Sequence, residues 1–315
     1  MSSGSSIIYY RVPKFVTVGF LSTVVGNFNR AFPYKGLQQN YFKLDFSSVC
    51  KVDVLGILLI YKFLEYIIVS KSFRGQEHNI YENKYLLDKI AEYGFEDLIR
   101  SLTNVVEDKE YKRLRIAEGN NCLIAPIALI RSNHDFSEDI LKNQYEPQVK
   151  AYYSSNHKAS DMILQVFTEI LHNFWAHATD DRSVIVGYGT KDVFEIACID
   201  NGLGIDGTMR TIYSSMSPQD AVLSAMQKGR TSKQGTNHMG YGLWFINQII
   251  TRVNGNMSVV SNNVHYENKR GYVKNCISTR WNGTIVYLRI PLKAPVTIAD
   301  IEDATQFNEL KINFQ

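Results

Sequence analysis

The sequence has few of the features that mark metal-binding, disulfide-rich or nucleic-acid-binding proteins. Among its 315 residues there are four cysteines, which lie far apart without a CxxC pair, so neither a zinc site nor a disulfide framework is expected. Lysines and arginines do not cluster, and the formal net charge is only +3, which argues against a footprint for nucleic acid. Internal repeats and low-complexity segments are also missing.

Long uninterrupted hydrophobic runs are missing as well. The most apolar stretch, residues 52–69, contains Asp53, Lys62 and Glu65, so it predicts a buried strand, turn and helix and not a membrane span. Residues 1–6 are small and polar, which gives no sign of a signal peptide. We therefore expect a cytoplasmic protein that makes no contact with a membrane.

What is present suggests two blocks, the first of which covers residues 1–132. Residues 41–46 alternate as a strand does. Helices are predicted over residues 55–69, 85–93 and 96–102. With the turn Asp53-x-x-Gly56, this order resembles the STAS domain of anti-sigma-factor antagonists. A generic α/β half-domain explains the pattern equally well.

The second block covers residues 154–292 and opens with a helix predicted over residues 160–178. A polar linker or connecting helix is expected before it, at 133–153, and a tail after it, at 293–315. Polar residues on the predicted helix recur every four positions and form one stripe, Gln165, Glu169, Asn173 and His177. A stripe of this kind is usually no more than a solvated helix face.

Three glycine-containing segments follow the stripe. The sequence DNGLG at 200–204 comes after a strand predicted over 193–199 and makes either a hairpin turn or the floor of a pocket for a flat ring. The sequence GYGL at 240–243 precedes an amphipathic helix, where glycines expose backbone N–H groups that bind phosphate. Gly283 and Thr284 then lead into the last strand.

In this order the motifs resemble the N, G1, G2 and G3 boxes of the GHKL ATPases, named after gyrase, chaperone, histidine kinase and MutL. The resemblance covers residues 154–291 and begins with Glu169-x-x-x-Asn173-x-x-x-His177. It implies an α/β sandwich of the Bergerat type that binds ATP with Mg²⁺. The fold class expected for the chain is therefore α/β, with a STAS-like domain followed by a GHKL domain.

The resemblance also implies a role for each motif residue. Asn173 would complete the coordination of Mg²⁺, and Asp200 would accept a hydrogen bond from the adenine amine, supported by Thr284 through an ordered water. Glu169 would act as a general base. The ring and phosphates would be contacted by Gly202, Gly204, Gly240, Gly242 and Leu243.

Residues 227–235 are rich in glycine and basic side chains and resemble the ATP lid of the family. Arg230 and Lys233 would reach the γ-phosphate from there, although basic loops are commonly just solvated. His177 matches a histidine in the N box of anti-sigma-factor kinases, and packing at a helix end explains it equally well.

Three functions agree with these motifs: an ATPase switch that changes contacts with a protein partner, a serine/threonine kinase acting on a separate STAS partner, and an ATP sensor without chemistry. A gyrase-like transducer is not expected, because only residues 292–315 follow the last strand. A histidine autokinase is disfavoured, because His134 and His157 lie in polar surroundings without heptads.

The turn Asp53-Val54-Leu55-Gly56 lacks the hydroxyl that STAS antagonists carry at this place, so phosphorylation within the chain is excluded there. We expect a regulatory ATPase switch with a protein partner, of the STAS type or another regulatory kind. The resemblance also allows a homodimer.

Overall fold

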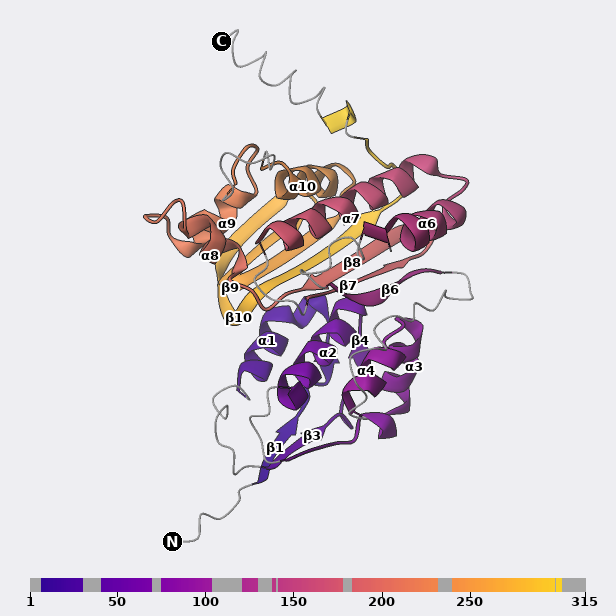
Figure 1. Cartoon of the computed structure of the whole chain (residues 1–315), viewed down its shortest axis with the longest axis vertical. Helices are drawn as coiled ribbons and strands as arrows, with labels where there is room; N and C mark the ends of the chain where they lie inside the picture. The colour runs from indigo at the N-terminus through magenta and orange to yellow at the C-terminus, as the bar shows by residue number, and fades with distance from the viewer. Residues whose placement is uncertain are drawn as a thin grey trace.

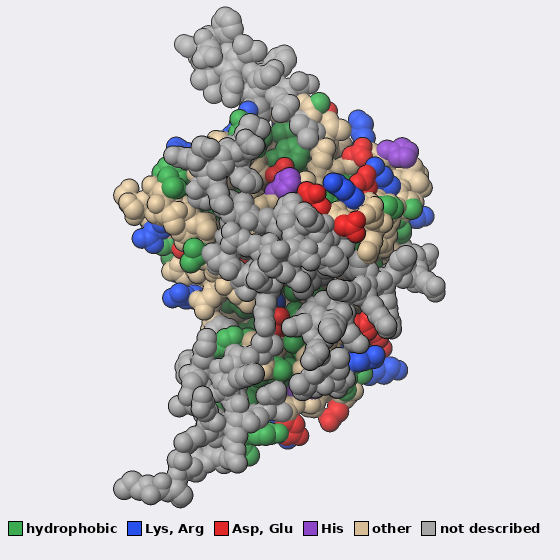
Figure 2. Space-filling view, viewed as in Figure 1, with side chains coloured by type: hydrophobic (Ala, Val, Ile, Leu, Met, Phe, Trp, Pro, Cys, Tyr) green, Lys and Arg blue, Asp and Glu red, His purple; other side chains and the backbone are tan. Residues whose placement is uncertain are grey.

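The chain folds into two α/β parts that lie one against the other along the long axis of the molecule (Figure 1). The computed structural model describes residues 7–30, 41–69, 75–103, 121–129, 138–139, 141–177, 183–231, 240–297 and 299–301. On the face shown in Figure 2, acidic, basic and histidine side chains are interspersed over the C-terminal part.

The N-terminal part contains a parallel sheet with the strand order β1-β3-β5 and a short parallel pair of β2 with β4. The strands are β1 (Ile7–Arg11), β2 (Phe15–Val16), β3 (Tyr41–Asp45), β4 (Lys51–Val52) and β5 (Gly75–His78). The helices are α1 (Leu21–Asn29), α2 (Val54–Val69), α3 (Lys84–Glu92) and α4 (Glu96–Thr103). The helices expected over 55–69, 85–93 and 96–102 are present, each within one residue of its predicted ends.

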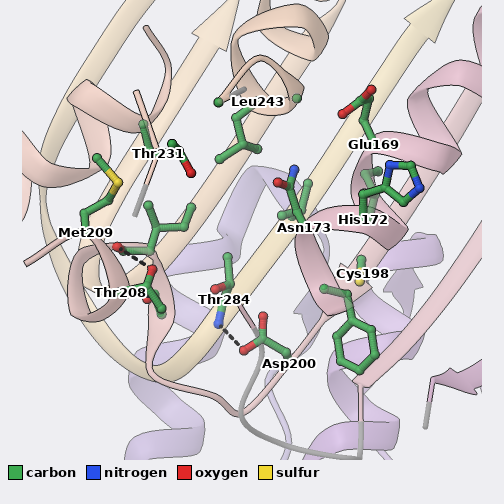
Figure 3. A pocket seen from close by; sticks show the side chains of 18 of the residues that line it. Glu169, His172, Asn173, Cys198, Asp200, Thr208, Met209, Thr231, Leu243 and Thr284 are labelled. Atoms are coloured by element: carbon green, nitrogen blue, oxygen red, sulfur yellow. Dashed lines mark hydrogen bonds between the residues drawn. The ribbon is translucent and has the colours of Figure 1, made fainter. Parts of the chain in front are cut away.

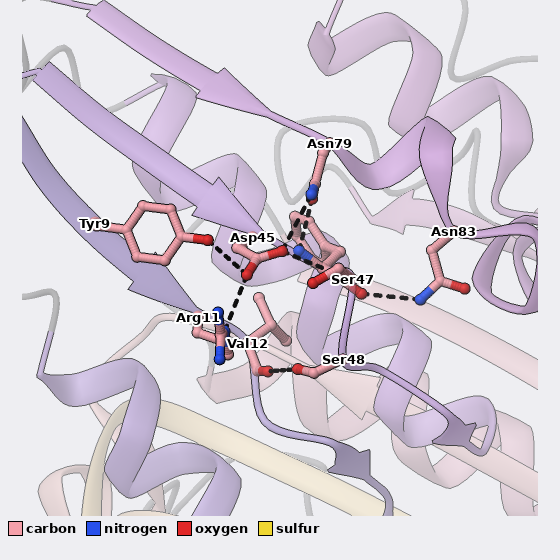
Figure 4. Close-up of polar contacts among 9 residues, drawn as sticks. Tyr9, Arg11, Val12, Asp45, Ser47, Ser48, Asn79 and Asn83 are labelled. Carbon is pink, nitrogen blue, oxygen red and sulfur yellow. Dashed lines mark hydrogen bonds and ion pairs between the residues drawn. The ribbon is translucent and has the colours of Figure 1, made fainter.

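One carboxylate ties the ends of these strands together (Figure 4). Asp45, the last residue of β3, accepts hydrogen bonds from Tyr9 Oη at 2.6 Å and Arg11 Nε at 2.9 Å, both on β1. It also accepts from Ser47 N at 2.9 Å and Asn79 Nδ2 at 3.1 Å. These bonds, first of all those from Ser47 and Tyr9, hold the pKa of Asp45 well below its usual range. Asp45 therefore links β1 to the segments that follow β3 and β5 at the carboxyl end of the sheet.

Helix α2 is the centre of the N-terminal part. Every residue from Val54 to Glu65 is buried. Asp53 caps the helix, because its carboxylate accepts from Gly56 N at 2.8 Å and also from Val18 N at 2.8 Å. Burial raises the pKa of Asp53 to about 6. Among the described residues, no helix is both long and apolar enough to cross a membrane.

The C-terminal part is an antiparallel sheet with the strand order β6-β7-β8-β10-β9. The strands are β6 (Cys122–Leu129), β7 (Ser183–Gly189), β8 (Val193–Ile199), β9 (Asn256–Lys269) and β10 (Tyr272–Pro291). The helices are α6 (Glu146–Tyr152), α7 (His157–His177), α8 (Gly204–Arg210), α9 (Pro218–Ala225) and α10 (Gly242–Arg252). Helices α6, α7 and α10 lie along one face of the sheet (Figure 1).

The sheet differs from the expected domain division in one respect. β6 pairs with β7 from Cys122 opposite Gly189 to Leu129 opposite Ser183, so it belongs to the C-terminal sheet. The sequence alone indicates a first block that extends to residue 132. A short apolar run predicts a strand, but it does not indicate which sheet the strand will join. The segment expected as a linker also contributes buried residues to the C-terminal core, since it contains a π-helical turn at Leu141–Tyr145 and α6.

The opposite face of the sheet is covered by the N-terminal part. Helix α2 packs on β7 and β8, and α1 packs on β10. Along β8 the side chains alternate: Ile196 and Cys198 pack with α7 and α10, whereas Ala197 and Ile199 join the core that contains α2. The two parts therefore share one continuous hydrophobic core across the back of the sheet.

Candidate functional site

A cavity of about 270 Å³ opens on the helix-covered face of the C-terminal sheet (Figure 3). The residues expected from the sequence that line it are Glu169, Asn173, Asp200, Gly204, Arg230, Gly240, Gly242, Leu243 and Thr284. Gly202 lines a neighbouring cleft instead. Lys233 lies outside the described residues, and so does the side chain of His177. The structure thus brings segments from all four motifs to one place.

Asp200 forms the floor of the cavity, directly after the last residue of β8. Its Oδ1 accepts hydrogen bonds from Gly202 N at 2.8 Å and Thr284 N at 3.2 Å. In Figure 3 the other carboxylate oxygen points into the cavity. Burial raises the pKa of Asp200, and these two N–H donors oppose that effect. Thr284 therefore supports Asp200 through a direct backbone contact. The ordered water expected between Thr284 and Asp200 stays a prediction.

Gly283 allows β10 to pass close to Asp200. Its φ is +118°, and a Cβ there would lie 2.2 Å from the carbonyl oxygen of Asp200. The backbone bonds between Asp200 and Thr284 require this close approach, because Asp200 N also donates to Thr284 O at 2.9 Å. Gly283 therefore allows β10 to lie close enough to orient the carboxylate of Asp200.

Glu169 and Asn173 lie one turn apart on the inner face of α7 and point to the other end of the cavity. Burial raises the pKa of Glu169, and the charge of His172 opposes that rise. The Nδ2 atom of Asn173 is buried and has no hydrogen-bond partner in the described part of the protein. A buried amide without a partner is costly, which favours a polar ligand at this position.

The N-terminus of α10 approaches the same two side chains. A Cβ on Gly242, the first residue of α10, would lie 2.6 Å from Glu169 Oε2 and 3.2 Å from Asn173 Nδ2. Glycine at this position therefore keeps the space between the two helices open. The first N–H groups of α10 have no partners within the helix, and its dipole favours anions there. This end of the cavity suits phosphate groups.

A magnesium ion fits this end of the cavity through one residue. The amide of Asn173 offers the hard oxygen that Mg²⁺ prefers, and phosphates and water would supply the remaining ligands. Within the described ranges, no group of three His, Cys, Asp or Glu side chains is placed to hold a metal ion without such help.

Sequence reasoning missed most of the walls of the cavity. The additional lining residues are Ile170, His172, Phe174, Cys198, Ile205, Thr208, Met209, Ala225, Thr231, Tyr241 and Val286. Most of them are apolar and leave room for a flat ring beside Asp200. The alternation of β8 could have identified Cys198, because it shares a face with Ile196. The residues on α8 carry no comparable signal.

Two cations lie on aromatic rings at the mouth of the cavity. Lys228 Nζ is 5.7 Å from the ring centre of Tyr241 and 5.3 Å from that of Trp244. The guanidinium carbon of Arg230 is 5.9 Å from the ring centre of Tyr213. Distances below about 6 Å are typical of cation–π attraction. The first basic residues of the expected lid are thus held beside the opening.

Comparison with known proteins agrees with this site. Residues 158–294 match the family model described as "Histidine kinase-, DNA gyrase B-, and HSP90-like ATPase", a range that runs from α7 to just beyond β10. Neither the curated proteins nor the solved structures contain a match. The STAS-like domain and the closeness to anti-sigma-factor kinases therefore stay expectations. The similarity of this chain to the histidine kinase-, DNA gyrase B- and HSP90-like ATPases is therefore carried by residues 158–294, the part that holds the cavity.

Proposed function

We propose that this protein binds ATP with Mg²⁺ and acts as a slow ATPase switch that changes its contacts with a protein partner. One observation supports the proposal above all. The same cavity is lined by the N-terminus of α10 and by Asp200, Asn173 and Glu169. The family match of residues 158–294 supports the ATP-binding part of the proposal.

The adenine would bind at the Asp200 end. The carboxylate oxygen that points into the cavity would accept a hydrogen bond from the exocyclic amine, among the apolar side chains of Phe174, Met209 and Val286. Guanine carries a carbonyl oxygen at that position, and two acceptors facing each other repel. A hydrogen bond to a charged acceptor contributes roughly 1.5–3 kcal/mol, enough to select adenine.

The phosphates would bind at the α10 end. The free N–H groups of the first turn of α10 and the guanidinium of Arg230 would contact them, and Asn173 would hold the magnesium ion. When bound, that ion would neutralise phosphate charge. Glu169 lies at this same end, half-buried and with a raised pKa, which suits a general base better than an exposed glutamate would. This favours turnover of ATP over binding alone.

One part of the chain is excluded as a substrate. The turn at Asp53 has no hydroxyl, and it lies in the N-terminal part, beyond the face of the sheet that is opposite the cavity. A kinase reaction would therefore need a separate protein, of the STAS type or another regulatory kind. That reaction is the alternative to hydrolysis.

Incubation with γ-labelled ATP and Mg²⁺, with and without a STAS-type protein, tests the proposal. We expect free phosphate to accumulate slowly and no protein to become labelled. Label on the added protein would establish the kinase alternative. Tight ATP binding with neither product would leave an ATP sensor, and absence of binding by calorimetry would contradict the proposal as a whole.

A further inference from the structure

The backbone of Asp200 is held by the same stretch of β10 that holds its side chain. Asp200 N donates to Thr284 O at 2.9 Å, and Asp200 O accepts from the indole Nε1 of Trp281 at 3.0 Å. Trp281 is only 4% exposed and belongs to the hydrophobic core shared with the N-terminal part. A buried indole N–H usually has a partner, so the bond alone would be ordinary. Its acceptor gives it a further meaning, because that acceptor belongs to the residue at the floor of the cavity.

The stretch of β10 around Trp281 is irregular. Trp281 pairs with Asn262 of β9, and the register of the two strands shifts on both sides of this pair, between Ile277 and Trp281 and between Trp281 and Thr284. Irregularities of this kind bend a strand and change the direction of its side chains. Through this bend β10 brings Trp281, Gly283 and Thr284 together at the end of β8.

Helix α1 of the N-terminal part holds the residues just before Trp281. Thr279 Oγ1 donates to Ser22 O at 2.8 Å. Asn29 Nδ2, at the end of α1, donates to the carbonyl oxygen of Arg280. These bonds lie where α1 packs on β10 (Figure 1). The segment that carries the indole is therefore held in place by the N-terminal part.

We propose that Trp281 is a positioning residue of the nucleotide site, whose indole N–H keeps the carboxylate of Asp200 directed at the base and thereby increases the preference for adenine. The inference rests on the proposed role of Asp200 in binding adenine. The direction of the Asp200 carbonyl is set by the backbone torsion ψ of that residue. The same torsion decides whether Gly202 N can reach Asp200 Oδ1, a bond of 2.8 Å. Loss of the indole N–H would free this torsion, and the carboxylate would lose its fixed direction.

The test is the ratio of the affinities for ATP and GTP in Trp281→Phe, measured by calorimetry with Mg²⁺. Phenylalanine fills most of the same space and has no N–H to donate. We expect ATP to bind about fivefold more weakly, the usual effect of one lost hydrogen bond. GTP has no amine facing Asp200, so its affinity should stay the same and the ratio should fall about fivefold. An unchanged ratio would overturn the inference.

Two further variants separate the hydrogen bond from packing. Phe63→Leu is the matched control, because Phe63 lies on α2 in the same core and its side chain has no donor. It should lower the free energy of unfolding and keep the ratio of the wild type, and an equal fall of the ratio there would show that Trp281 serves packing alone. Benzothienylalanine at position 281 keeps the shape of the indole and carries sulfur in place of the N–H. It must lower the ratio as Trp281→Phe does, and a ratio like that of the wild type would overturn the inference.

A measurement without nucleotide separates this inference from the proposed function. In Trp281→Phe the amide hydrogen of Gly202 should exchange with solvent about fivefold faster than in the wild type, because its acceptor is no longer held. Phe63→Leu should leave this exchange unchanged. An unchanged rate in Trp281→Phe would overturn the inference even if ATP bound as proposed. Faster exchange in a protein that bound no ATP would support the positioning role of Trp281 and contradict the proposed function.

Discussion

At the scale of single residues, the carboxylate of Asp200 makes the most direct prediction. Asp200→Asn turns one acceptor into a donor that faces the adenine amine, so we expect ATP affinity to fall at least about tenfold with the fold intact. Calorimetry measures the change, and Asn201→Ala, at the exposed neighbour, is the matched control. An unchanged affinity would remove the adenine-site assignment.

Asn173 predicts how ATP binding depends on metal. Because its amide would supply the only protein ligand of Mg²⁺ that we assign, Asn173→Ala should bind ATP equally well with and without Mg²⁺, at the level of the wild type in chelator. Gln165→Ala, two turns earlier on the same stripe and outside the cavity lining, should keep the dependence on Mg²⁺. A variant at Asn173 that still gains affinity from Mg²⁺ would contradict the assignment.

A substitution at Glu169 distinguishes ATP turnover from ATP binding. Glu169→Gln keeps the volume of the side chain and removes its basicity, so ATP should still bind while turnover falls about 10²-fold or more. Burial raises the pKa of Glu169, so turnover of the wild type should be lost, as pH falls, at a higher pH than for an exposed glutamate. That acid limb should be absent in the variant. Equal rates in the two proteins, clearly above background, would rule out the catalytic role.

At the scale of elements, the start of α2 is held in place by one glycine. A Cβ on Gly56 would lie 1.8 Å from the carbonyl oxygen of Val16 in β2, so Gly56→Ala must push the helix away from that strand. We expect a loss of about 1–3 kcal/mol in the free energy of unfolding, as for other overpacked cores, measured by denaturant titration. Gly19→Ala, where a Cβ meets its nearest described neighbour at 3.9 Å, should be close to neutral.

The elements also show where sequence reasoning succeeds. Helix α7 and strand β8 could be predicted because their hydrophobic residues recur with the period of a helix and of a strand. The four motifs identify the cavity because their glycines and polar side chains are recognisable in short stretches of sequence. α8 and α9 were missed, since they are short and lie in a glycine- and serine-containing segment without a strong period. The sheet that β6 joins could not be predicted, because pairing between distant strands leaves no local pattern.

The burial of the ion pair between Lys62 and Glu65 could not be predicted for a similar reason. In the sequence, Lys62 and Glu65 only interrupt a hydrophobic stretch, and they served to exclude a membrane span. They are buried because the C-terminal sheet covers α2, and that contact joins segments more than a hundred residues apart in the chain. A match of residues 158–294 to one family says nothing of how the N-terminal part packs on that region.

At the scale of the whole molecule, the two faces of the C-terminal sheet are covered by different parts of the chain. One face holds α7, α10 and the cavity, and the other is covered by α1 and α2 of the same chain. A homodimer, which the family resemblance allows, would therefore have to form through another surface, because α1 and α2 already cover this one.

The covered face has a consequence for how signals depend on concentration. Because α2 belongs to the same chain as the sheet on which it packs, the contact between them does not depend on the amount of protein in the cell. Dilution should therefore leave α1 and α2 in place on the sheet. Only a contact with a separate protein would be sensitive to the number of molecules present.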